Sequence, residues 1–106
     1  MEQTSAVKNA ADATQVKKAR KNVKLVEQQE RLDLEWVLKT PQGRRVFWRM
    51  LSKAGIYHSI WEPSAKIHYN AGKQDYGLWL LAQLEQSSPD YTLLMMKENR
   101  KESENV

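Results

Sequence analysis

The chain has no cysteine, so it forms no disulfide bond and has neither a thiolate metal ligand nor a cysteine nucleophile. Glycine and proline are also scarce, and the four glycines stand apart from one another. A phosphate-binding loop needs closely spaced glycines, so the sequence predicts no such loop. The longest apolar run, residues 78–82, is far shorter than the ~20 residues that cross a bilayer. Residues 1–20 lack the apolar segment of a signal peptide, and we expect no membrane span.

Patterns that support catalysis or metal binding are equally sparse. There is no Gly-x-Ser-x-Gly nucleophile motif, and the acidic residues are scattered rather than paired. The two histidines, His58 and His68, are not spaced as metal ligands, and a zinc site with Glu62 would require a special fold of the connecting segment. Surface or capping roles are the simpler interpretation. We predict that the protein is not an enzyme and that it uses no metal and no cofactor.

The large apolar residues that are present lie mainly after residue 24. All four Trp, all four Tyr, the single Phe and every Leu fall within residues 25–96. The core must therefore come from the later part of the chain, which is marginal for independent stability. Self-association or docking on a larger assembly would supply additional stability.

Positive charge is concentrated in the first half. Residues 1–53 hold 12 Lys/Arg against 6 Asp/Glu, a balance of +6, whereas residues 54–106 hold 5 against 7, a balance of −2. A basic half attracts polyanions such as nucleic acid, an anionic lipid surface or an acidic protein. A solvated helical surface would explain the same charges without any ligand.

The first 24 residues are rich in Ala and Lys and contain neither Gly nor Pro. Their helix propensity is high, but no broad apolar stripe would hold such a helix on a core. We predict a basic, partly helical arm over 1–24, a helical domain over 25–98 and a charged, fraying tail over 99–106. Within the arm, the candidate polyanion-binding residues are Lys17, Lys18 and Lys21. A solubilising tail is the alternative.

Start and stop signals define the first helices of the domain. Thr40 is suited to an N-cap, Pro41 to the first helical position, and Gly55 to the residue after a helix end. Helices are therefore expected over 25–39 and 41–54. At helical spacing, the residues expected to fill the core are Trp36, Phe47 and Leu51.

The second half repeats these signals. Ser64 can cap a third helix, which should be interrupted around Gly72 and should resume over 76–86. Ser88 and Pro89 mark the start of a last short helix. No strand pattern competes, so the expected fold is all-α: a compact three- to four-helix domain preceded by the basic arm.

The most apolar predicted helix has more than one apolar face. Tyr76, Leu80 and Leu84 form one face, whereas Leu78 and Trp79 point elsewhere. A helix that is apolar nearly all round is usually covered on more than one side. We therefore predict that Leu78 and Trp79 contact a second chain.

Basic and aromatic residues gather on the helix predicted at 41–54. Arg44 and Trp48 are one turn apart, and Arg45 and Arg49 adjoin them. Trp48 could stack on a nucleobase while the arginines contact phosphates. Trp and Arg are also the residues of protein-binding hot spots. A third reading has Trp48 packed beneath the segment around Trp61, with the Arg side chains lying over it.

Three separate blocks of sequence carry a family resemblance. They read DLEWVL and PQGRRVFWRMLSKAGIY at residues 33–38 and 41–57, AGKQDYGLWLLA at 71–82, and YTLLMMKE at 91–98. In this order they resemble a family of small tailed-phage proteins, typified by a Bordetella phage protein from the virion-morphogenesis gene region. The resemblance covers about residues 31–98 and does not include the arm.

The resemblance implies a phage origin, and it implies no activity and no catalytic residue. The leading hypothesis is a minor virion or assembly component, a helical module that docks on a phage structural protein or on its own copy, or that is packaged and ejected. The alternative is a host-takeover or nucleic-acid-binding accessory protein, which the basic first half suggests. Both hypotheses place the protein in the virion or in the host cytoplasm.

Overall fold

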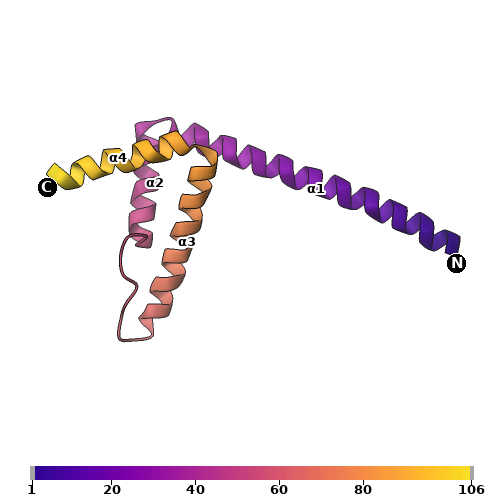
Figure 1. The fold of residues 1–106 in the computed structure, drawn as a ribbon, viewed down its shortest axis with the longest axis horizontal. Coiled ribbons are helices and arrows are strands. Elements are labelled where there is room, and N and C mark those ends of the chain that lie inside the picture. The colour runs from indigo at the N-terminus through magenta and orange to yellow at the C-terminus, as the bar shows by residue number, and fades with distance from the viewer. Residues whose placement is uncertain (1, 106) are drawn as a thin grey trace. The chain divides into compact units, whose positions relative to one another are not determined.

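The computed structural model describes the backbone of residues 2–105 and the side chains of residues 11–100. This part of the chain forms four α-helices and no strand, which confirms the all-α prediction. The helices are α1 (Glu2–Leu38), α2 (Pro41–Ala54), α3 (Lys66–Ser87) and α4 (Pro89–Asn105) (Figure 1). The chain divides into two compact units, Met1–Glu30 and Arg31–Val106.

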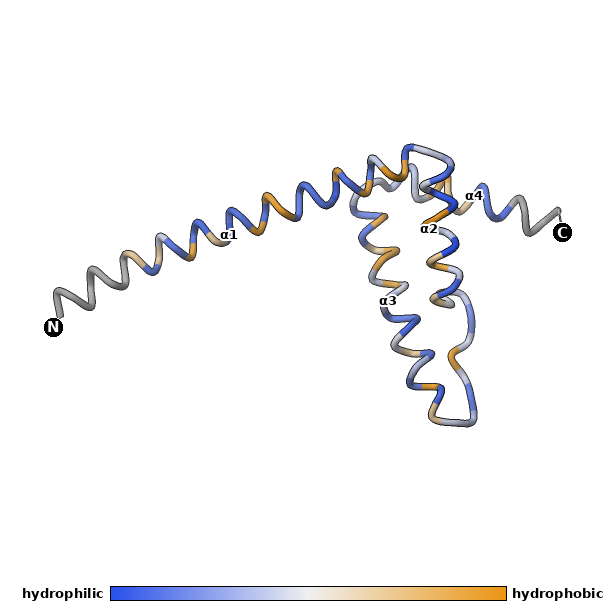
Figure 2. Tube along the Cα trace, turned by 180° about the vertical axis from the view of Figure 1, so that it is seen from behind, coloured by the Kyte–Doolittle hydropathy of each residue, from blue (hydrophilic) through white to orange (hydrophobic). Residues whose placement is uncertain are grey.

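The first unit consists of the N-terminal part of α1. Every residue from 11 to 30 is exposed, including the apolar Val16 and Val23. Figure 2 shows that hydrophobic residues (orange) are interspersed with hydrophilic ones (blue) along α1. The unit ends at residue 30, beyond the boundary expected at residue 24. The side chains of residues 1–10 of the expected arm, and of 101–106 of the expected tail, lie outside the described residues.

Local signals set both ends of α2 and the start of α4, as the sequence predicted. Thr40 has extended backbone angles, and its hydroxyl accepts a 3.0 Å hydrogen bond from the Gly43 amide at the start of α2. Gly55 ends α2 with a φ of 75°, a left-handed conformation that glycine adopts without steric cost. Its amide donates to the Ser52 carbonyl, and α4 begins at Pro89. The residue that precedes α3 is Ala65 and makes no side-chain capping bond, so the expectation that Ser64 is the N-cap residue is wrong.

Helix α3 is continuous from Lys66 to Ser87, so the interruption expected around Gly72 is wrong. One glycine in a helix interior costs only about 1 kcal/mol, and neighbouring side chains tie this part of α3 to the segment that precedes it. The Gln74 amide donates to the carbonyls of Gly55 at 2.9 Å and His58 at 2.8 Å. The Asn70 amide donates to Ile60 at 3.3 Å. These contacts hold residues 70–74 of α3 against the preceding segment.

Each helix contributes one fully buried apolar residue to a small core. These residues are Leu38 of α1, Leu51 of α2, Leu84 of α3 and Met95 of α4. Partly buried side chains pack around them, namely Leu34, Phe47, Trp48, Ile56, Leu80, Leu81 and Tyr91. Leu51 thus lies where the sequence predicted it, and Phe47 packs at the edge of the core.

Trp36 does not belong to the core, and its side chain is 72% exposed. The face of α1 that meets the core is instead the one bearing Leu34 and Leu38, which are one turn apart. A residue midway between two such positions points to the opposite side of the helix, because successive residues are rotated by about 100°. The prediction that Trp36 fills the core is therefore wrong, because Trp36 lies on the opposite face of α1.

Candidate functional site

A groove of about 800 Å³ lies between α2 and α3, which run side by side in Figure 1. Its lining residues are Val46, Arg49, Met50, Lys53 and Ala54 from α2, with His68, Tyr69, Gly72, Lys73, Tyr76, Gly77 and Leu80 from α3. Each set recurs every three or four residues, which places it along one face of its helix. The groove thus has two helical walls.

Two glycines of α3 shape the groove in different ways. Gly77 is buried where the helices touch: a Cβ atom added there would lie 2.5 Å from the Cβ of Ala54 and 2.8 Å from the Cγ2 of Ile56. Only a residue without a side chain allows this close approach. Gly72 lies five residues closer to the start of α3, and a Cβ atom added there would meet nothing within 4 Å. The space above Gly72 is therefore open.

The groove combines apolar walls with positive charge. Val46 and Met50, both exposed, provide much of the apolar surface of α2. Arg49 and Lys53 stand on the same wall, and Lys73 stands on the wall formed by α3. The Lys73 Nζ atom lies 5.4 Å from the ring centroid of Tyr69, within the range of a cation–π contact. None of the residues that line the groove is acidic.

An aromatic pair extends the groove along α3. Tyr76, which the sequence places on one apolar face with Leu80 and Leu84, is 64% exposed and lines the groove. Its ring centroid lies 5.4 Å from that of Trp79, and the two planes are tilted by 42°. Trp79 is 54% exposed and Leu78 is 46% exposed, so both lie away from the core face, as the helical wheel predicted. Whether they contact a second chain stays a prediction.

Trp48 is partly covered by its own chain. It packs against the core, and its ring centroid lies 6.1 Å from that of Tyr57. The expected partner, Trp61, is exposed. The packing interpretation of Trp48 therefore describes its surroundings best, with Tyr57 in place of Trp61.

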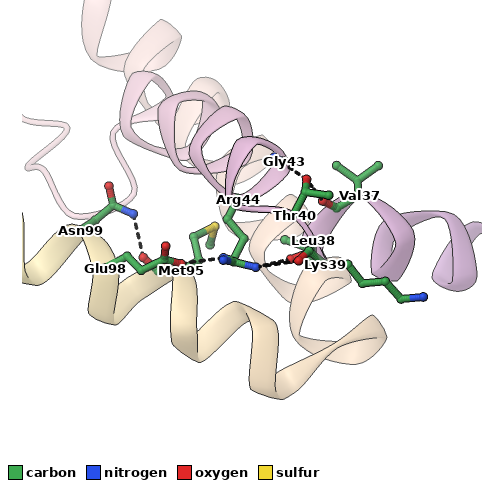
Figure 3. Close-up of polar contacts among 9 residues, drawn as sticks. All are labelled: Val37, Leu38, Lys39, Thr40, Gly43, Arg44, Met95, Glu98 and Asn99. Atoms are coloured by element: carbon green, nitrogen blue, oxygen red, sulfur yellow. Dashed lines mark hydrogen bonds and ion pairs between the residues drawn. The ribbon is translucent and has the colours of Figure 1, made fainter.

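Arg44 is buried, so its assignment to a polyanion-binding surface is corrected. Its Nη1 atom donates to the carbonyl of Leu38 at 2.8 Å and to that of Lys39 at 3.2 Å. Its Nε atom donates to the Glu98 carboxylate at 2.6 Å. Figure 3 shows the guanidinium group between the end of α1 and the side chain of Glu98 on α4. The cation there satisfies carbonyls that a helix end leaves unpaired, and it interacts favourably with the helix dipole.

Helix periodicity, rather than the charge pattern, carries the signal for this burial. Arg44 precedes the buried Leu51 by two helical turns, so both lie on the core face of α2. Arg45 and Arg49 are exposed on the same helix. Only these two of the three arginines remain candidates for binding a polyanion.

The basic residues predicted in the arm lie on α1. Lys17, Lys18 and Lys21 are all exposed, and so are Arg20 and Lys24. With about 100° per residue, four of the five fall within an arc of about 100° on the helix, the exception being Lys18. This part of α1 therefore carries a continuous basic stripe.

The described part of the chain has neither a metal-binding cluster nor a membrane-spanning helix. Among these residues, no three His, Asp or Glu side chains gather closely enough to hold a metal ion. No described helix has the combination of length and hydrophobicity that a membrane crossing requires. Comparisons with protein families, with curated proteins and with solved structures find no match to the chain.

Proposed function

We propose that the protein is a non-enzymatic docking module, a minor component of a phage particle or of its assembly, that binds a protein partner through α3 and the adjoining groove. The phage assignment rests on the family resemblance of residues 31–98. The docking role rests on one observation above all: Tyr76, which lines the apolar groove, and Trp79, whose ring lies beside that of Tyr76, both expose large apolar side chains. Leu78 is exposed on another side of α3.

Physical reasoning favours a contact at this surface. Large exposed apolar patches usually mark an interaction site, and Trp and Tyr are enriched among residues that dominate binding energy. The core of the second unit is also small, with four fully buried apolar residues among those described. A partner that covered α3 would bury additional apolar surface and stabilise the folded chain.

The test of this proposal compares Trp79→Ala with Trp61→Ala. Both residues are exposed tryptophans, but Trp61 lies in the segment between α2 and α3 and does not line the groove. Trp79→Ala should weaken association by about 2 kcal/mol, as expected for an interface hot spot. Trp61→Ala should leave association unchanged. Light scattering would report self-association, and co-purification with phage particles followed by mass spectrometry would report a structural partner.

Equal association of the two variants would argue against docking through α3. A monomeric protein that is absent from purified particles would contradict the component role and would favour the alternative, a host-takeover or nucleic-acid-binding accessory protein.

The basic stripe on α1 is the observation that supports this alternative. Binding to nucleic acid should then weaken steeply as salt rises, because each neutralised phosphate releases counterions. Lys17→Ala and Lys21→Ala, made singly in the stripe, should each reduce the affinity and the salt dependence of binding more than Arg45→Ala does. Electrophoretic mobility shifts at several salt concentrations measure both quantities. Binding that disappears near physiological salt is expected of any basic protein and would not support the alternative.

A further inference from the structure

We propose that the groove between α2 and α3 binds an amphipathic helix of a partner protein, one whose apolar stripe is flanked by acidic residues. This inference rests on the proposed docking function and names the chemistry of the partner. It uses the shape of the groove, its charges and the open space above Gly72.

The shape of the groove suits a helix. Its walls are two neighbouring helices, and each presents apolar side chains at intervals of one turn, such as Val46 and Met50 on α2 and Tyr76 and Leu80 on α3. A bound helix presents its own apolar side chains at the same intervals, and this spacing underlies the recognition of helices in grooves. Because Gly72 has no side chain, a ligand side chain can occupy the open space above it.

The basic residues of the groove favour acidic residues on both sides of the apolar stripe of the bound helix. Arg49 and Lys53 stand on one wall and Lys73 on the other, while no acidic residue lines the groove. A helix lying along the groove floor would therefore bring the residues on both sides of its apolar stripe close to a cation. Acidic residues at these positions would be attracted, and basic residues would be repelled.

The exposed part of α1 is a poor occupant for the groove of a second copy. Residues 17–24 of α1 include five Lys or Arg and no acidic residue. This stretch would place like charges next to Arg49, Lys53 and Lys73. The chemistry of the groove therefore favours a different chain with acidic flanks.

The experiment uses the full chain and two labelled synthetic peptides of about 18 residues, long enough to form several helical turns. Both peptides carry the same Leu stripe, and the stripe is flanked by Glu in one peptide and by Lys in the other. Fluorescence anisotropy measures their affinities at low and moderate salt. The Glu peptide should bind at least about tenfold more tightly than the Lys peptide, with a preference that declines as salt screens the charges.

Two variants of the protein locate the binding. Gly72→Leu should reduce the affinity for the Glu peptide by about tenfold or more, because its side chain would enter the groove. Circular dichroism should confirm that the variant stays folded, since the new side chain starts in open space. Lys53→Glu combined with Lys73→Glu should reverse the preference toward the Lys peptide. Trp61→Ala, outside the groove, is the control and should change neither affinity.

The outcomes separate this inference from the docking function. Equal binding of both peptides, abolished by Gly72→Leu, would overturn the acidic partner and would support docking of a helix in the groove. Binding that Gly72→Leu leaves intact, or no binding of either peptide, would overturn the groove as a helix site. The docking function would then depend on the comparison of Trp79→Ala with Trp61→Ala, which requires neither peptide.

Discussion

Replacing Arg44 by alanine should destabilise the protein strongly, although arginine is usually a surface residue. Its side chain connects three helices: it lies on α2, donates to the carbonyls of Leu38 and Lys39 at the end of α1, and pairs with Glu98 on α4. Removing it leaves the Leu38 carbonyl without this donor in a buried position. It also opens a cavity beside the core.

The magnitude follows from the individual contacts. Loss of a hydrogen bond from a charged donor to a buried carbonyl costs about 1.5–3 kcal/mol. The Glu98 side chain is 39% exposed, so water can replace the lost ion pair, which we therefore count at no more than about 1 kcal/mol. Together with the lost packing of the side chain, these contacts predict a decrease of about 3 kcal/mol in the free energy of unfolding.

The assay is urea unfolding followed by circular dichroism. With a slope of about 1–2 kcal/mol per molar, Arg44→Ala should lower the midpoint by more than about 1 M. Arg45→Ala is the matched control, because Arg45 is the adjacent residue and is exposed. Its midpoint should stay close to that of the wild type. Arg44→Lys should fall between the two, since an ammonium group cannot reproduce the geometry of the guanidinium fork. Equal midpoints for Arg44→Ala and Arg45→Ala would refute the burial argument.

Two further predictions test the packing of α3 and the independence of the two units. Gly77→Ala should destabilise the protein by about 1–3 kcal/mol, because its Cβ would collide with that of Ala54. Gly72→Ala should stabilise it by up to about 1 kcal/mol through helix propensity. Urea unfolding midpoints that shift in the same direction for both variants, relative to the wild type, would contradict this contrast. Brief trypsin treatment should cleave within residues 17–24, where no side chain is buried, and should leave a folded fragment near residues 31–106. Mass spectrometry identifies the fragments. Equal protection of both units from cleavage would show that they are not independent.

The amino-acid sequence by itself determined the fold class and most helix ends, because these depend on neighbouring residues. The hydroxyl of Thr40 needs only the Gly43 amide three residues away, and the left-handed conformation of Gly55 is a property of glycine itself. The helical wheel likewise separated Leu78 and Trp79 from the core face of α3, since helix geometry fixes the relative directions of side chains.

Tertiary structure alone decided which of several plausible faces is buried. Helix periodicity places Arg44 on the same face as Leu51, but only the tertiary structure brings it to its partner Glu98, which is 54 residues away in the sequence. Trp36 is exposed because the core meets the opposite face of α1. The groove required α2 and α3 to come together at Ala54 and Gly77, a contact between distant segments that helix periodicity does not encode.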